Sequence, residues 1–567
     1  MTRRHGFFSH ALFLLVLSFG LGLAGCEGDD GAAGRDGVDG VNGVNGADGA
    51  DGADGADGAA GQACWDLNNN GSGDAEEDAN GDGIVDVKDC NAYASGDAYK
   101  PAALHAGYFT DNVYEGTESC LDCHGKLADE VLETAHFTWE GVASNIEGFE
   151  GGIHGKKDIL NNFCIGVASN EGRCTQCHAG YGYADNTFDF SNPENIDCLV
   201  CHDQTATYQK AKPTAGMPEA AVDLQAVARS VASNGGRPTI ENCIDCHAFA
   251  GGGDNVKHGD LALNLADTTF EYDVHMGTDG VAKFVCVDCH QVRKDGDDNV
   301  LSHGIGGMPY HSVDEGVMKD CDDCHGSAVN IHTGTTAETI VSSTNHDKLA
   351  CQVCHIPTFA RFTSTKVDWD WSTAGAVVDP IPVDPVTGRA TYDRKKGTFI
   401  WANNVRPELR FFNGKWNKML VNVNDTYAAE PAVLASPVGD YNDAEAMIYP
   451  FKKMVGKQPA DVVNQRILVP HLFGTAGGPN PYWGTWDWDL SLLDAAAITG
   501  QPYTSGDFGF VSTEMYLTVN HESAPKEEAY GYENDCGDCH FDDKIDWAAL
   551  GWDADPVEGG AQVLPLP

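Results

Sequence analysis

The pattern of hydrophobic and polar positions divides the 567-residue chain into regions of different character. Residues 7–23 are apolar apart from Ser9, His10 and Ser18, whereas residues 28–63 consist mainly of glycine, alanine and aspartate. Further along, the pattern predicts short helices around residues 121–134 and 219–232. After residue 23, no stretch is long and apolar enough to span a bilayer. We therefore expect a loop-rich body with short helices.

The apolar run at the start of the chain has the features of an export signal. Arg3 and Arg4 precede it, and it ends at Leu23-Ala24-Gly25-Cys26. The run is short for a membrane span, and its charged start is typical of a signal peptide. Its ending resembles the bacterial lipoprotein box, which implies that residues 1–25 are removed and that the Cys26 thiol carries a lipid; a spare, unmodified cysteine is the alternative. We expect an exported protein, periplasmic or at the cell surface, that is held at the outer membrane only by this lipid.

Residues 26–63 form a spacer that contains twelve unbroken Gly-x-y triplets. Glycine at every third position is what a collagen triple helix requires at its axis, and such a helix would extend roughly 110 Å at about 3.1 Å per residue. The repeat contains no proline, which weakens a short triple helix. Two interpretations stay open: a triple helix that joins three chains, and a flexible acidic tether.

Residues 64–91 have the spacing of two adjacent calcium-binding loops. Each loop alternates oxygen-bearing side chains and places a glycine where the loop must turn sharply. The first loop offers Asp66, Asn68, Asn70, Asp74 and Glu77, and the second offers Asp78, Asn80, Asp82, Asp86 and Asp89. We expect Ca²⁺ to bind here, in a module that resembles thrombospondin-type or dockerin-like repeats. An ordinary acidic linker is the alternative.

Eight copies of Cys-x-x-Cys-His follow and use 16 of the 20 cysteines. Two thiols three positions apart can add to the two vinyl groups of one haem, and the adjoining imidazole can then reach its iron. Zinc ribbons do not need a histidine after each cysteine pair, and a disulfide scaffold does not need one repeated spacing. We therefore expect eight covalently bound c-type haems. In chain order, motifs 1 to 8 are Cys120-Cys123-His124, Cys174-Cys177-His178, Cys198-Cys201-His202, Cys243-Cys246-His247, Cys286-Cys289-His290, Cys321-Cys324-His325, Cys351-Cys354-His355 and Cys536-Cys539-His540.

The haem-bearing body is expected to span residues 92–567. Seven motifs lie between residues 120 and 355, and a haem-free insert of residues 355–535 precedes the eighth. We expect a multihaem cytochrome c fold, mainly helical and irregular around a closely packed stack of eight haems, with little β structure and with the insert wrapped around the stack. The net charge of −50, from 85 acidic and 35 basic residues, argues against nucleic acid as a partner.

An iron that only transfers electrons needs a second axial ligand besides its motif histidine. Eleven histidines outside the motifs and the signal segment are available for eight positions, so their number alone does not show that any iron is open. Our preferred second ligands are His136, His258, His275, His303, His332, His346 and His521, with His105, His154 and His311 as substitutes.

One basic segment stands out in this acidic chain. Lys156, Lys157 and Arg173 lie within eighteen residues of one another, just before motif 2. A solvated basic turn is the ordinary interpretation of a lysine pair. The functional alternative is that a neutral lysine amine binds the iron weakly while the remaining cations attract an anion.

Several longer motifs of the body resemble the octahaem tetrathionate reductase family. They comprise residues 155–164, 174–183, 197–203, 251–260, 351–357, 368–375, 512–516 and 519–522, and the resemblance covers most of residues 100–550. It implies that motif 2 carries the active-site haem, whose distal ligand is a lysine, and that seven bis-histidine haems carry electrons. By position that lysine is Lys156 or Lys157, with a preference for Lys156. Cys164, Lys257 and Asp254 are further candidates for the pocket, against plain structural roles for each.

The resemblance implies a terminal reductase that takes electrons from a donor cytochrome or a quinol-linked chain. Its substrate would be a small inorganic anion, tetrathionate, which is reduced to two thiosulfates. Similar haem sites reduce nitrite or hydroxylamine, so these acceptors stay open. The alternative function is a surface electron conduit in which all eight haems carry two histidines.

Overall fold

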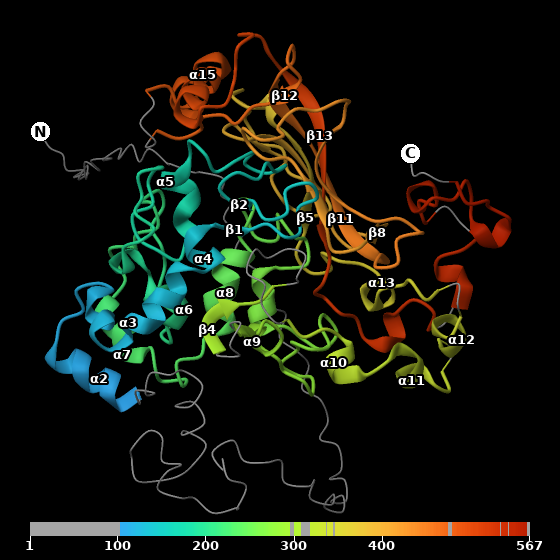
Figure 1. The fold of residues 1–567 in the computed structure, drawn as a ribbon, viewed down its shortest axis with the longest axis horizontal. Coiled ribbons are helices and arrows are strands. Elements are labelled where there is room, and N and C mark those ends of the chain that lie inside the picture. The colour runs from blue at the N-terminus through green and yellow to red at the C-terminus, as the bar shows by residue number, and fades with distance from the viewer. Residues whose placement is uncertain are drawn as a thin grey trace, which may run out of the picture.

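The computed structural model describes residues 102–294, 300–307, 318–335, 337–343, 346–474, 479–532, 535–541 and 544–563 (Figure 1). The export signal with Cys26, the Gly-x-y spacer, both calcium-type loops from Asp66 to Asp89, and His311 lie outside the described residues. The expectations for these segments therefore stay predictions. Among the residues described, no helix has the length and apolar character needed to cross a membrane.

Short helices make up the regular structure of the haem-bearing part. Two of them, α3 and α7, lie where the sequence pattern predicts helices. Asp223 caps α7 by accepting a hydrogen bond from the backbone N–H of Ala226, which satisfies one of the free donors of the first turn. The described α-helices are α2 (Ala102–Asp111), α3 (Glu118–Leu132), α4 (Ala135–Thr138), α5 (Glu171–Cys174), α6 (Cys198–His202), α7 (Leu224–Ser230), α8 (Ile240–His247), α9 (Cys286–Cys289), α10 (Asp322–His325), α11 (Ala328–His332), α12 (Glu338–Val341), α13 (Cys351–His355), α14 (Tyr482–Thr485) and α15 (Trp488–Thr499).

Most haem motifs lie on one helical turn. In α6, α8, α10 and α13 the motif histidine is the last residue of the helix. Positions three and four apart share a face of a helix, so both thiols and the imidazole project to the same side. In Figure 1 the motif helices follow one another across the lower half of the molecule, from α3 through α8 and α9 to α10.

Motif 2 departs from this pattern. Helix α5 ends at Cys174, a 3₁₀ turn covers Thr175–Cys177, and His178 has an extended backbone with φ −76° and ψ 136°. Cys174 and Cys177 line the interior cavity, whereas His178 does not.

The haem-free insert folds into a nine-stranded sheet, so the chain contains more β structure than we expected. Its main path runs β6-β7-β5-β11-β13-β10-β9, and β8 and β12 also pair with β11. The described strands are β1 (Glu140–Val142), β2 (Ile153–Gly155), β3 (Val292–Lys294), β4 (Val300–Ile305), β5 (Thr365–Asp370), β6 (Tyr392–Asp393), β7 (Gly397–Ala402), β8 (Glu408–Phe412), β9 (Trp416–Lys418), β10 (Ala432–Pro437), β11 (Met447–Asp461), β12 (Arg466–Ile467) and β13 (Phe508–Thr518).

The long antiparallel pair of β11 and β13 is the centre of this sheet. Their register runs from Phe451 opposite Thr518 to Asp461 opposite Phe508. Strand β5 runs parallel to β11, and β10 runs parallel to β13. Trp369 and Trp371 are fully buried in the large apolar core of the insert and stack on each other. These two tryptophans of the insert thus serve packing.

Figure 1 shows the sheet standing above the motif helices. Residues of β9, β10 and β13 line the same cavity as the haem motifs. The multihaem fold, with helices and loops around the motifs, is confirmed. The sheet forms one side of the cavity that the motifs line.

Candidate haem sites and a lysine-lined pocket

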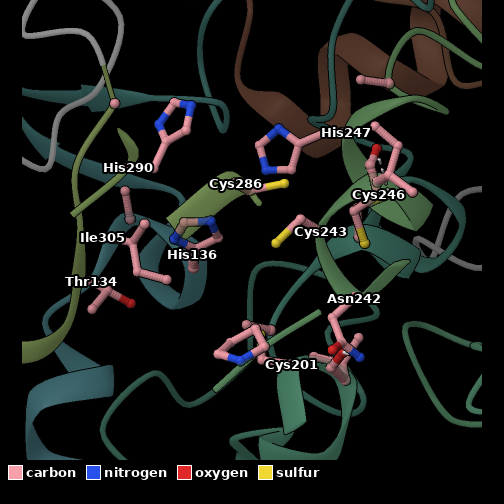
Figure 2. Close-up of a pocket in the computed structure, with 18 of the residues that line it drawn as sticks. Thr134, His136, Cys201, Asn242, Cys243, Cys246, His247, Cys286, His290 and Ile305 are labelled. Carbon is pink, nitrogen blue, oxygen red and sulfur yellow. Dashed lines mark hydrogen bonds between the residues drawn. The ribbon is translucent and has the colours of Figure 1, made fainter. Parts of the chain in front are cut away.

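One cavity of about 2060 Å³ runs through the haem-bearing part and is lined by cysteines of motifs 1 to 6. Figure 2 shows a section of it, in which the thiols of Cys243 and Cys286 point into the space between the rings of His136 and His247. Thiols and imidazoles that face one interior space are the arrangement that covalent haem attachment requires.

Seven motif histidines each face a second imidazole ring. The ring centres of these pairs lie 5.8–6.3 Å apart. Metal–imidazole bonds of about 2.0–2.1 Å on both sides of one metal, with roughly 1.1 Å from each ring nitrogen to its ring centre, give a separation of about 6.3 Å. The rings are thus spaced to hold a haem iron between them. The pairs are His105–His124, His136–His247, His202–His303, His275–His325, His290–His521, His332–His355 and His346–His540.

Six of our seven preferred histidines occur in these pairs, and the exception is His258. The ring opposite His124 belongs to His105, which α2 places across from α3, and His105 was only a substitute in the sequence analysis. His258 lines the cavity instead. His154, another substitute, lies 2.6 Å from a carboxylate oxygen of Asp158 through its Nδ1.

Several paired histidines are held in place through their Nδ1 atoms. Carboxylate oxygens lie 2.7 Å from Nδ1 of His540 and 3.2 Å from Nδ1 of His521. Backbone carbonyl oxygens lie 2.7–2.8 Å from Nδ1 of His202, His290 and His332. A partner at Nδ1 fixes the orientation of an imidazole and leaves Nε2 for the metal.

Contacts between motifs show their spatial order. The side chains of Cys120 and Cys198, of Cys243 and Cys286, and of Cys321 and Cys351 lie next to each other. Electrostatic contacts join Cys201 to Cys243, Cys289 to Cys324, and Cys354 to Cys539. The motifs therefore follow one another in the order 1–3–4–5–6–7–8. Motif 2 lies beside motif 4, because the Cys177 thiol donates a hydrogen bond to the carbonyl oxygen of Cys246.

At motif 2 the histidine points elsewhere. His178 is fully buried, and its Nε2 hydrogen-bonds to the carbonyl oxygen of Phe137. The rings of Phe137, Trp139, Tyr183 and Phe188 surround it at 5.2–5.4 Å. Burial lowers the pKa of His178 to about 4, so its ring is neutral. Among the described residues that line the cavity, Cys174 and Cys177 are present and His178 is absent, which differs from the expectation that His178 binds the iron.

A tight turn after β2 brings Lys156 to the cavity. A side chain at Gly155 would collide with the backbone of Trp139 and Glu140, so glycine is required where β1 and β2 pair. Asp158 accepts a hydrogen bond from the backbone N–H of Gly155 and fixes the turn. The Lys156 amine lies 4.0 Å from the ring centre of Trp139 and lines the cavity.

Lys157 points away from this site. Its amine donates a hydrogen bond to Glu140 at 2.8 Å and lies over the ring of Phe190. The sequence left the choice between the two lysines open, and the contacts favour Lys156 as the residue that reaches motif 2.

Five further cationic side chains line the same cavity: Arg173, Arg237, Lys257, Lys319 and Lys418. Burial, together with the charges of Lys156 and Lys418, lowers the pKa of Lys257 to about 8, so each of these two amines acts electrostatically on Lys257. Burial also lowers the pKa of Lys418 to about 8. The sequence analysis missed Lys418, because a single lysine on a strand of the insert gives no sign of the cavity it faces.

Two other candidates have structural roles. Cys164 is disulfide-bonded, so it is not a free thiol. Asp254 accepts a hydrogen bond from the backbone N–H of Leu263 at 2.9 Å, and burial raises its pKa. Cys164 borders the cavity, whereas Asp254 is not among the described residues that line it.

Comparison with known proteins identifies the class. The family described as "Cytochrome c bacterial" matches residues 366–543. The solved structure of octahaem cytochrome c from Shewanella oneidensis is 36% identical, with a TM-score of 0.68, and the match covers 81% of this chain and 99% of that one. A protein of Archaeoglobus fulgidus, described as uncharacterized, is 27% identical over 227 residues, which covers 31% of this chain and 73% of that protein.

The fold, the motifs and these matches define a multihaem oxidoreductase with covalently bound c-type haems. The chain belongs to the family of octahaem c-type cytochromes.

Proposed function

We propose that the protein reduces tetrathionate to thiosulfate at the haem of motif 2, and that the other seven haems deliver the electrons. The observation that carries this proposal is the contrast between seven paired histidines and one motif at which a lysine amine lines the cavity. The haems would supply one-electron transfer and, at motif 2, an iron with a position for substrate.

Lys156 is the ligand that the geometry favours for this iron. Its amine shares the cavity with Cys174 and Cys177, whereas Lys157 is bound to Glu140 and His178 is enclosed by aromatic rings. Cys174 and Cys177 would attach this haem and Lys156 would bind its iron, which would supply electrons and a binding position for the substrate.

The charges of the pocket suit an anion that gains charge during the reaction. Tetrathionate carries two negative charges; two electrons break its central S–S bond and give two thiosulfates with four charges in total, without consuming protons. Lys257, Lys418 and Arg173 would attract the dianion and offset the charge that builds up on the separating halves. Nitrite and hydroxylamine are the alternative acceptors.

The order of the motifs gives the electrons a route. Motif 4 is the neighbour of motif 2, and cysteines of motifs 1, 6 and 8 are exposed. A donor cytochrome or a quinol-linked carrier would deliver electrons at an exposed motif, and they would reach motif 2 through motif 4. We further propose that the protein is exported and held at the outer membrane by the lipid on Cys26, with the Gly-x-y spacer between membrane and body.

Two leucine variants test this function. Lys156→Leu should lower tetrathionate turnover by on the order of 100-fold, because it removes an axial ligand and alters one haem site. Lys157→Leu removes a neighbouring lysine of the same size and should keep turnover within about threefold. Haem absorption and electron paramagnetic resonance spectra should change in the first variant only. Unchanged turnover and spectra in Lys156→Leu would contradict the proposal, and spectra of the native protein with eight bis-histidine irons would support an electron conduit instead.

A further inference from the structure

We propose that Lys418 of the insert, together with Lys257, forms a second anion-binding position that holds the far end of a two-ended dianion in the motif 2 pocket. This inference rests on the proposed function and adds to it a reason why a dianion is selected. It assigns to the insert a part of substrate recognition.

The fold of the insert aims Lys418 at the cavity. Lys418 ends β9 and lies two positions after Trp416, so both side chains project to the same face of the sheet. Both line the cavity, and so does Ala435 of β10, which lies opposite Lys418 in the register. The Lys418 amine lies 5.3 Å from the ring centre of Trp416, and Asn417 between them is exposed. A rigid strand therefore presents this amine.

Lys257 comes from a different segment and is also fixed. The carbonyl oxygens of Val256 and Lys257 accept hydrogen bonds from the buried amine of Lys452 at 2.6 Å and 3.1 Å. Two cations that are held independently, one by the sheet and one by the loop after α8, thus converge on one space.

These amines have no acidic partner among the residues that the structure describes. The ion pairs formed within that part of the chain include neither Lys156, Lys257 nor Lys418. The chain carries 85 acidic and 35 basic residues, so unpaired lysines in one cavity are not an effect of composition. Lys156 is exposed and Lys257 and Lys418 are partly buried, and all three line the cavity. Cations that face one cavity without an acidic partner are suited to an anion from outside the polypeptide.

The arrangement of these lysines favours an anion with a negative charge at each end over an anion with a single charge. Lys156 lies at motif 2, and both Lys156 and Lys418 act electrostatically on Lys257. A dianion with charge at both ends, such as tetrathionate, can contact the iron side and the Lys257–Lys418 side together. Nitrite carries a single charge on a small ion and gains much less from the second position.

Two sources could supply an anionic oxygen to Lys418: the substrate and a haem propionate. We assign it to the substrate, and binding measurements on the haem-loaded, oxidised protein separate the two. Calorimetric titration with tetrathionate and with nitrite reports affinity without turnover. Potentiometric titration of the haems reports loss of a propionate partner.

The variants are Lys418→Met, Lys418→Arg and the surface control Lys415→Met, whose amine pairs with Glu147 and Glu150 outside the pocket. Lys418→Met should weaken tetrathionate binding by about tenfold or more, because a charge-assisted contact is lost. Nitrite affinity should change by less than about threefold, and Lys415→Met should leave both affinities within the same limit. Lys418→Arg keeps the charge and should restore most of the tetrathionate affinity.

Equal losses of tetrathionate and nitrite affinity, or a shifted haem potential in Lys418→Met, would assign Lys418 to a propionate and overturn the inference. Unchanged tetrathionate affinity would overturn it as well. A native protein that binds tetrathionate through Lys418 but does not reduce it would contradict the proposed function and leave the inference standing.

Discussion

The seven paired haem sites and the site at motif 2 use the same attachment sequence in different surroundings. At the paired sites a second imidazole completes each position at 5.8–6.3 Å between ring centres. At motif 2 aromatic rings enclose His178, and lysine amines face the cavity. The attachment motif therefore determines where a haem is bound, and the surrounding chain determines whether its iron is closed or available to a substrate.

The two regions also differ in how they treat charge. Carboxylates and carbonyls support the paired histidines, as Asp555 does for His540 at 2.7 Å. The pocket instead contains the amines of Lys156, Lys257 and Lys418, which form no ion pair with an acidic side chain among the described residues. A neutral, closed set of sites suits electron transfer, whereas an open and positively charged one suits binding of an anion.

The largest expected effect comes from removing the second histidine at motif 4, which is the motif that lies beside motif 2. His136→Leu removes the ring opposite His247 at motif 4, next to motif 2. Loss of this ligand should raise the potential of that haem by about 0.1 V, within the range of about 0.8 V that axial ligands span. The step from motif 4 to motif 2 then becomes uphill, and at 59 mV per tenfold change turnover should fall roughly 50-fold. Steady-state assays with a small soluble reductant measure this.

A matched variant at the end of the line completes that test. His346→Leu opens the site at motif 8, which lies farthest from motif 2 in the motif order. A small reductant can enter at another exposed motif, so turnover should fall much less than in His136→Leu. Equal losses of turnover in the two variants would contradict the motif order in which motif 2 lies beside motif 4 and far from motif 8.

The second effect concerns Lys452, which holds the backbone of the segment that carries Lys257. Lys452 is fully buried, and its amine donates hydrogen bonds to the carbonyls of Val256 and Lys257 and to the hydroxyl of Thr365. Lys452→Met leaves these acceptors unsatisfied and should lower the free energy of unfolding by about 2–4 kcal/mol. Lys453→Met removes an amine that pairs with Glu514 at the surface and should cost less than about 1 kcal/mol. Chemical denaturation of the haem-loaded protein provides the measurement, and equal losses would contradict the assigned role of Lys452.

The third effect is a pH dependence that belongs to the pocket alone. Burial lowers the pKa of both Lys257 and Lys418 to about 8. The amines are charged below this pH and neutral above it, so tetrathionate affinity should fall as pH rises. We expect a loss of about tenfold between pH 7 and pH 9 in calorimetric titrations. Lys418→Arg should reduce this loss, because arginine stays charged; a pH-independent affinity would contradict the role of the two amines.

The smallest effect is the tuning of one paired site. Asp555→Asn removes the carboxylate at Nδ1 of His540 and makes this ligand less basic. The potential of the motif 8 haem should rise by on the order of 30 mV, about threefold in the one-electron equilibrium. A potentiometric titration measures it, with Asp546→Asn as the exposed control. No shift in Asp555→Asn would show that the carboxylate does not tune this haem.

The sequence predicts the haem attachment and most of the paired histidines, because both follow from covalent chemistry with fixed spacing. It predicts His105 and His258 in the wrong order of preference, since only the packing of α2 against the rest of the chain shows which ring faces His124. Nothing in the spacing of motif 2 indicates that the backbone becomes extended at His178.

For a similar reason, the sequence did not predict the sheet or the contribution of its residues to the pocket. Trp416 and Lys418 alternate on a strand of three residues, which is too short to give a clear period-two pattern. Their common face becomes visible only when β9 pairs with β10 and the sheet closes one side of the cavity.

The attachment of motif 2 to the middle of the motif order, at motif 4, gives the molecule a store of reducing power. Each of the seven haems in this order could hold one electron, so the fully reduced set would contain more than the two electrons that the proposed cleavage of one S–S bond would consume. A donor that collides rarely and gives single electrons can then sustain a two-electron reaction, because the second electron is already inside when the first is used. The haems would store electrons that arrive one at a time and would deliver two of them to each reaction.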